Sequence, residues 1–227
     1  MKRLIAFGCS NTLGEALPDC VANTDPARNR PSVQAWPAQL SQRMRRECVN
    51  LGHGGASNKF IADRVLNFDF AAADCAVILW TDFARWSVFR QQHCQRLLPT
   101  DCGLSSVAVQ KMAADKKQTR FYYKHLHTET DSVFNSFAMI NLVKLLLDQQ
   151  QIENHHFAWT EPLVNTAVPR TQPKWNSTDL ELVQFHTALG TAEDNVHPSA
   201  AAHAAMADTM LHKITAGPKA AERPAPH

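Results

Sequence analysis

Short apolar runs alternate with longer amphipathic stretches in the first third of the chain. Leu4 to Phe7 and Ala76 to Trp80 are unbroken apolar runs, which is typical of strands buried on both faces. Cys48 to Leu51 is a similar, shorter run that ends in a glycine. The apolar residues between these runs recur at helical spacing: Val33, Trp36, Leu40 and Met44, then Phe60, Ile61, Val65 and Phe68. Strands that alternate with helices predict a mainly parallel, doubly wound sheet.

The last third of the chain returns to the same alternation. The stretch from His155 to Thr160 predicts a fourth strand. Residues 178–190 begin with a capping-box pattern and end in glycine, which predicts a helix. A final helix is expected from about Pro198 to Ile214. Residues 217–227 offer no core residues and predict a disordered tail, so we expect a single domain over residues 1–216.

Residues 83–131 interrupt the alternation. They show weak periodicity, several aromatic residues, and more Lys and Arg than Asp and Glu. We interpret this segment as an insertion above the strand ends, where it serves as a lid or a wall of the substrate site. A solvated helical excursion without a ligand is an equally good interpretation.

Composition narrows the classes of partner. The chain has 227 residues, 44% hydrophobic and 19% charged, as in a soluble globular protein. Its net charge of +2 gives no general reason to expect nucleic acid as a partner, and no stretch is long and apolar enough for a membrane span. The six cysteines form no CxxC pattern and are expected to be free thiols. We therefore expect a cytoplasmic protein, cellular or virus-encoded, with no nucleic-acid or membrane partner.

Candidate chemistry stands at the two ends of the chain. Ser10 follows the first predicted strand and Gly8, which places it at the carboxyl edge of the sheet, where ligands bind in open α/β folds. Asp194 and His197 lie three residues apart, just before the last predicted helix, with Pro198 expected as its first residue. A nucleophilic serine needs a base, and the base needs an orienting group. The sequence therefore predicts that Ser10, His197 and Asp194 act together.

Four short blocks in this order resemble those of the SGNH (GDSL-type) hydrolase superfamily. The first and last are Gly8-Cys9-Ser10 and Asp194-Asn195-Val196-His197-Pro198. The second is the glycine-rich turn from Asn50 to Asn58, and the third falls on Leu79-Trp80-Thr81-Asp82. The first block has Cys where the family has Asp, and the third lacks the family's Gly and Asn.

The resemblance implies a three-layer α/β/α sandwich with a flavodoxin-like sheet and a serine esterase activity. Ser10 would attack an acyl or O-acetyl ester, His197 would act as general base and acid, and Asp194 would orient the imidazole. The oxyanion hole would be formed by the backbone N–H groups of Ser10 and Gly55, assisted by Thr81. The implied substrate is a small-molecule or glycan ester, or a lipid ester, and neither a metal nor an organic cofactor is needed.

Two other functions stay open on the residues alone. The altered first and third blocks favour a catalytically degenerate module kept for binding or structure. An acyltransferase would use the same three residues, with a sugar or lipid hydroxyl in place of water. A nucleic-acid-binding module rests only on the basic insertion, because no recognised motif accompanies it.

Several further side chains allow two interpretations. Asn58 is a helix cap or a substrate-binding amide, with the cap favoured, and Arg85 pairs with a carboxylate or faces substrate. His53 is expected at the surface beside the site, and Cys9 is expected to pack inward. The pair His155-His156 suggests a metal site only weakly, because adjacent residues of a strand point to opposite faces.

Overall fold

The centre of the molecule is a five-stranded parallel sheet. The computed structural model describes residues 2–22, 26–90, 93–97, 116–159, 180–185 and 187–216. The strands of the main sheet are β1 (Arg3–Phe7), β2 (Glu47–Asn50), β3 (Cys75–Trp80), β6 (Glu153–Ala158) and β7 (Leu180–Leu182). Their spatial order is β2-β1-β3-β6-β7, and each neighbouring pair is parallel. Counted within this sheet, the order is 2-1-3-4-5, as in flavodoxin-like folds, so the predicted fold class is confirmed.

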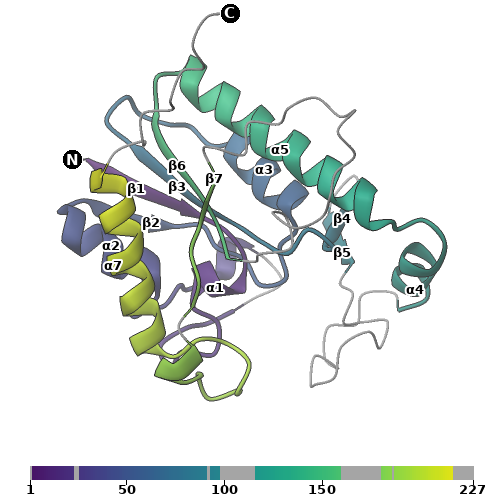
Figure 1. Cartoon of the computed structure of the whole chain (residues 1–227), viewed down its shortest axis with the longest axis horizontal. Helices are drawn as coiled ribbons and strands as arrows, with labels where there is room; N and C mark the ends of the chain where they lie inside the picture. Colours follow the sequence, from purple (N-terminus) through teal and green to yellow (C-terminus); the bar gives the residue numbers. More distant parts are fainter. Residues whose placement is uncertain are drawn as a thin grey trace, which may run out of the picture.

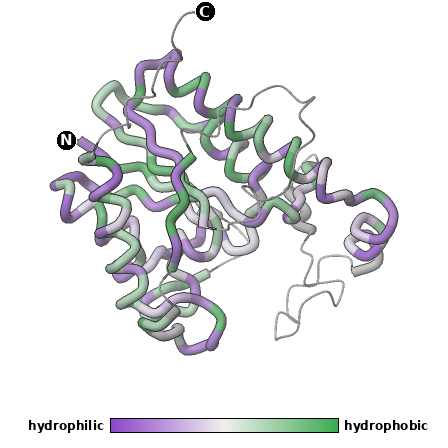
Figure 2. Tube along the Cα trace, viewed as in Figure 1, coloured by the Kyte–Doolittle hydropathy of each residue, from purple (hydrophilic) through white to green (hydrophobic). Residues whose placement is uncertain are grey.

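Alternation along β1 divides its apolar side chains between two cores. Ile5 and Phe7 pack into one core, and Leu4 and Ala6 pack into the other. The central strand β3 is buried along its whole length, which explains its unbroken apolar sequence. Figure 2 shows hydrophobic and hydrophilic residues alternating along α5, as expected of a helix with one face on a core and one in solvent.

Helices cover both faces of the sheet and complete three layers (Figure 1). On one face α2 (Trp36–Met44) packs against α7 (Ala200–Ala216), and on the other α3 (Asn58–Leu66) packs against α5 (Glu129–Gln149). Each pair covers one of the two cores. No helix in the described part of the chain is long and apolar enough to cross a membrane.

The remaining elements are short and lie outside the three layers. They are α1 (Ser10–Leu13), the 3-10 turns η1 (Pro26–Arg28) and η4 (Thr187–Leu189), the antiparallel hairpin of β4 (Trp86–Arg90) and β5 (His93–Leu97), and α4 (Lys116–His125). The hairpin and α4 belong to the predicted insertion over residues 83–131. Tyr123 of α4 donates its hydroxyl to the carbonyl of Ala84 at 2.6 Å, which ties α4 to the loop after β3. A role as a lid stays a prediction.

Two predicted helices differ from the structure. Residues 180–182 form β7, so the prediction of a helix over residues 178–190 was wrong. Leu180 packs into one core and Val183 into the other, as strand residues do, but a three-residue strand leaves too short an alternation to outweigh the capping-box pattern. The last helix begins at Ala200, so Pro198 precedes it rather than starting it. The predicted tail, residues 217–227, lies outside the described residues.

Candidate active site

All four sequence blocks follow the carboxyl ends of strands. Ser10 comes after β1, the glycine-rich turn after β2, Thr81 after β3, and the turn with Asp194 and His197 after β7. Since these strands are parallel, their carboxyl ends lie at one edge of the sheet. The strand order reverses between β1 and β3, and this is the position where open α/β sheets bind their ligands.

Ser10 is the first residue of α1 and is 7% exposed. The N–H groups that open a helix have no acceptor within it, so the N–H of Ser10 has no partner inside α1. A side chain at Gly8 would meet the hydroxyl of Thr12 at 1.9 Å, which is why only glycine allows this tight turn from β1 into α1. Cys9 is buried in the core, as predicted.

The glycine-rich turn is attached directly to the Ser10 turn. Asn50 donates its side-chain amide to an α1 carbonyl at 2.7 Å and accepts the N–H of Gly52 at 2.9 Å. The N–H of His53 donates to the carbonyl of Gly8 at 3.1 Å. A Cβ at Gly52 would lie 2.4 Å from a backbone nitrogen of α1, so the two segments are in backbone contact. Gly55 has a positive φ of 68°, which suits glycine at the bend.

His53 lies inside the molecule, and its predicted surface position was wrong. It is 3% exposed and stacks on Phe60, with ring centroids 5.1 Å apart. Its Nδ1 accepts the side-chain amide of Asn29 at 2.9 Å. Gly52 brings the turn so close to α1 that the next side chain is directed inward against α3.

Asn58 holds the end of β3 in place. Its Oδ1 accepts the N–H of Thr81 at 2.8 Å, and its Nδ2 donates to the carbonyl of Thr81 at 3.1 Å and to Ser136 Oγ at 3.1 Å. Ser57 is the N-cap of α3, because its side chain accepts the N–H of Phe60. The preference for Asn58 as the cap was therefore wrong. Asn58 is 2% exposed, and both hydrogens of its amide are already donated. The amide therefore has no donor left with which to bind a substrate.

Thr81 and Arg85 carry buried polar atoms without partners among the described residues. Thr81 is 0% exposed, and its Oγ1 makes no hydrogen bond. Arg85 donates its backbone N–H to Asp82, while the Nη1 of its side chain is buried and unbonded. Neither predicted role, oxyanion donor or substrate contact, is decided by these contacts.

Asp194 and His197 form a hydrogen-bonded pair. The backbone N–H groups of Val196 and His197 both donate to Asp194 Oδ1 at 2.9 Å, and His197 Nδ1 lies 2.5 Å from Asp194 Oδ2. Partial burial by itself would raise the pKa of Asp194, but these hydrogen bonds outweigh it and lower the pKa. An ionised carboxylate only accepts, so Nδ1 carries a proton, and in a neutral ring Nε2 is then the acceptor.

The start of α2 connects the two ends of this edge. Ser32, just before α2, donates its N–H to the carbonyl of Leu13 in α1 at 3.0 Å, and Trp36 donates its N–H to His203 Nδ1 at 3.2 Å. His203 lies in the first turns of α7. Burial, followed by the nearby charge of His197, lowers the pKa of His203 to about 4. Sequence reasoning missed His203, since a single histidine in an alanine-rich run gives no signal.

The structure therefore brings Asp194 to His197 and the glycine-rich turn to Ser10. Among the described residues, no hydrogen bond joins Ser10 to His197. The triad as a unit stays a prediction.

No protein-family model matches the chain, and no curated protein matches its sequence. Solved structures match over nearly its whole length. A carbohydrate esterase whose active site displays divergent catalytic and non-catalytic binding functions is 12% identical, with a TM-score of 0.52 over 94% of this chain and 65% of that chain. A member of the lipolytic G-D-S-L family from Veillonella parvula DSM 2008 is 10% identical, with a TM-score of 0.47 over 95% of this chain and 99% of that chain. A family two carbohydrate esterase from Clostridium thermocellum, solved with cellohexaose, is 13% identical, with a TM-score of 0.48 over 95% of this chain and 64% of that chain.

Sequence identities this low support a similar fold and do not extend to function. The chain shares the fold of the carbohydrate esterase with the TM-score of 0.52, so the predicted three-layer α/β/α fold is confirmed.

Proposed function

We propose that the chain is a serine-dependent esterase that hydrolyses an acyl or O-acetyl ester carried by a carbohydrate or lipid. The observation that supports this proposal is the Asp194–His197 hydrogen bond, in a turn that follows β7 as Ser10 follows β1. A base oriented by a carboxylate on the same edge as a strand-end serine is the arrangement that nucleophilic catalysis requires.

The reaction follows from the roles of these groups. His197 Nε2 takes the hydroxyl proton of Ser10 as the oxygen attacks the acyl carbonyl, and returns it to the leaving alcohol. Asp194 stabilises the imidazolium that forms between these steps. The N–H groups of Ser10 and Gly55 donate to the oxyanion, together with the hydroxyl of Thr81. Water then releases the acyl group by the same steps.

A catalytically degenerate binding module is the second candidate, and one observation favours it. The hydroxyl of Thr81 is fully buried, and the nearest amide, on Asn58, is occupied in holding Thr81. The third donor is therefore the weakest part of the proposed machinery. An acyltransferase would differ only in its acceptor, so product analysis with a competing alcohol separates it from a hydrolase.

Labelling with a fluorophosphonate probe tests for an activated serine. Wild type should be labelled, and mass spectrometry should locate the adduct on Ser10. Ser10→Ala and His197→Ala should lose the label and on the order of 10⁴- to 10⁶-fold in turnover. Ser132→Ala, a buried serine of α5, and His212→Ala, an exposed histidine of α7, are matched controls that should keep both.

Triad members act as a unit, so the double variant of Ser10 and His197 should be little worse than either single variant. A folded wild-type protein that takes no label and turns over no ester would reject the esterase and support the binding module. Full activity in Ser10→Ala would reject the assignment of the nucleophile.

A further inference from the structure

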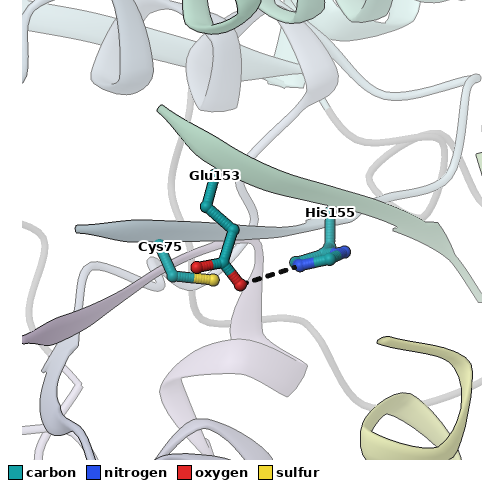
Figure 3. Close-up of side chains that lie close together, drawn as sticks. All are labelled: Cys75, Glu153 and His155. Carbon is teal, nitrogen blue, oxygen red and sulfur yellow. Dashed lines mark hydrogen bonds and ion pairs between the residues drawn. The ribbon is translucent and has the colours of Figure 1, made fainter. Parts of the chain in front are cut away.

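A second group of reactive side chains lies at the opposite edge of the sheet. Cys75 is the first residue of β3 and Glu153 the first of β6, and the two are direct neighbours in the strand register. His155 stands two residues further along β6, so its side chain leaves the same face of the sheet as that of Glu153. Figure 3 shows the three side chains converging on one point. Their ligand atoms all lie within 4.8 Å of one another.

The distances suit a metal ion better than a hydrogen bond. His155 Nε2 lies 3.4 Å from Glu153 Oε1, which is long for a hydrogen bond between these groups. In a tetrahedral site with metal–ligand bonds of about 2.1 Å, two ligand atoms are separated by about 3.4 Å. The pair is thus already spaced as two corners of such a site.

Arg46 holds one oxygen of Glu153, and the other oxygen faces the histidine of the group. Arg46 Nη2 donates to Glu153 Oε2 at 2.5 Å, whereas Oε1 faces His155. An outer partner that orients a ligating carboxylate is a regular feature of metal sites. A thiolate at Cys75 and the carboxylate carry two negative charges, of which Arg46 offsets one, so a divalent cation is still attracted.

The group is open to solvent on one side. Cys75 is fully buried, but the side chains of Glu153 and His155 are 43% and 25% exposed. An ion can therefore enter from the side of β6, and water can fill a fourth position. Burial, and next the charge of Glu153, raise the pKa of Cys75 to about 12, so an incoming ion has to displace the thiol proton.

We propose that Cys75, Glu153 and His155 bind a divalent ion of the zinc type, with water as the fourth ligand. Thiolate, imidazole and carboxylate together are the donors that zinc takes in proteins. The ion would tie the amino ends of β3 and β6 together. It would lie at the other end of β3 from Thr81, about 20 Å away at the rise of a strand, and so take no part in ester hydrolysis.

Cobalt(II) titration of the full, tag-free, reduced chain tests this site. We expect one equivalent to bind with a thiolate-to-cobalt charge-transfer band in the near ultraviolet, and zinc to displace it. Cys75→Ala should lose the band, while Cys48→Ala, a half-buried thiol on β2, should keep it. His155→Gln and Glu153→Gln should bind at least about tenfold more weakly, since losing even an outer partner costs that much. His212→Gln, on the surface of α7, should bind as wild type.

Zinc should also raise the melting temperature of wild type but not of Cys75→Ala, because it binds the folded site more tightly than the unfolded chain. A folded wild type without the band, or a band that persists in Cys75→Ala, overturns the proposal. If Cys75→Ala does not fold, His155→Gln decides the matter, because its side chain is partly exposed, and unchanged affinity there overturns the site. Ser10→Ala should bind cobalt like wild type, which separates this result from that of the proposed esterase.

Discussion

Replacing Asp194 by asparagine changes one atom and reverses one hydrogen bond. Asp194 Oδ1 accepts the backbone N–H groups of Val196 and His197, both at 2.9 Å, and an asparagine oxygen can accept both. The turn that positions His197 is therefore retained. The other oxygen, 2.5 Å from His197 Nδ1, becomes an NH₂ group, which only donates.

Two donors cannot face each other, so the imidazole has to present Nδ1 as an acceptor and carry its proton on Nε2. A protonated Nε2 cannot take the proton of Ser10. The same exchange in a Ser-His-Asp triad of the chymotrypsin type lowers kcat by about 10⁴ through this wrong tautomer. We expect a loss of the same order in Asp194→Asn, or about 5.4 kcal/mol of transition-state stabilisation. Substrate binding and the melting temperature should change little, because the backbone bonds remain.

The assay is kcat and KM on short acyl esters, with nitrogen NMR of the His197 ring to read the tautomer directly. Asp208→Asn is the matched control, because Asp208 is 63% exposed on α7 and pairs with Arg43 away from the candidate site. Its kcat should stay at the wild-type value. If Asp194→Asn turns over within about tenfold of wild type while the ring carries its proton on Nε2, the assignment of His197 as the base is refuted.

Two further predictions concern buried polar groups. Thr81→Val removes a buried hydroxyl that has no partner among the described residues, which should raise the melting temperature because such a group costs about 1–3 kcal/mol. It should also lower kcat by on the order of 10²–10³ with KM little changed, and an unchanged kcat would put the third oxyanion donor elsewhere. Burial lowers the pKa of His156 from 6.5 to about 3, so the unfolded chain takes up this proton first. Its contribution to stability is complete above about pH 6.5 and declines by up to about 1.4 kcal/mol per unit as the pH falls towards 3. Urea denaturation between pH 4 and 7 should show the free energy of unfolding rising with pH. In His156→Gln this slope should be smaller by the amount that one proton contributes, and equal slopes in the two proteins would contradict the prediction.

Much of the fold could be predicted because its strands are apolar throughout. The runs at residues 4–7 and 76–80 correspond to β1 and β3, which are buried on both faces and tolerate no polar interruption. The strand order came from the resemblance rather than from periodicity, which carries no information on neighbours. β7 was missed because a strand of three residues is shorter than any window that reveals alternation.

Contacts of the candidate site could be predicted where they are local in the sequence, and could not where they join distant segments. The bond between Asp194 and His197 spans three residues of one turn, so their spacing was enough to predict it. The bond from Asn58 to Thr81 joins a helix start to a strand end 23 residues away and depends on how both pack. The proximity of Cys75 to Glu153 depends on the register of β3 with β6. No sequence spacing reports that register.

In the altered third block, the side-chain hydroxyl of Thr81 takes the place of the family's asparagine amide as the candidate donor. Both backbone groups of Thr81 are bound to the amide of Asn58, so its hydroxyl is the one donor that Thr81 has left. The N–H groups of Ser10 and Gly55 likewise donate to no other described residue. In the described part of the chain, three successive strand ends therefore each present one donor without an acceptor. In the proposed esterase, the acceptor for these three donors arrives with the substrate. An ester carbonyl that develops negative charge in the transition state is an acceptor of that kind.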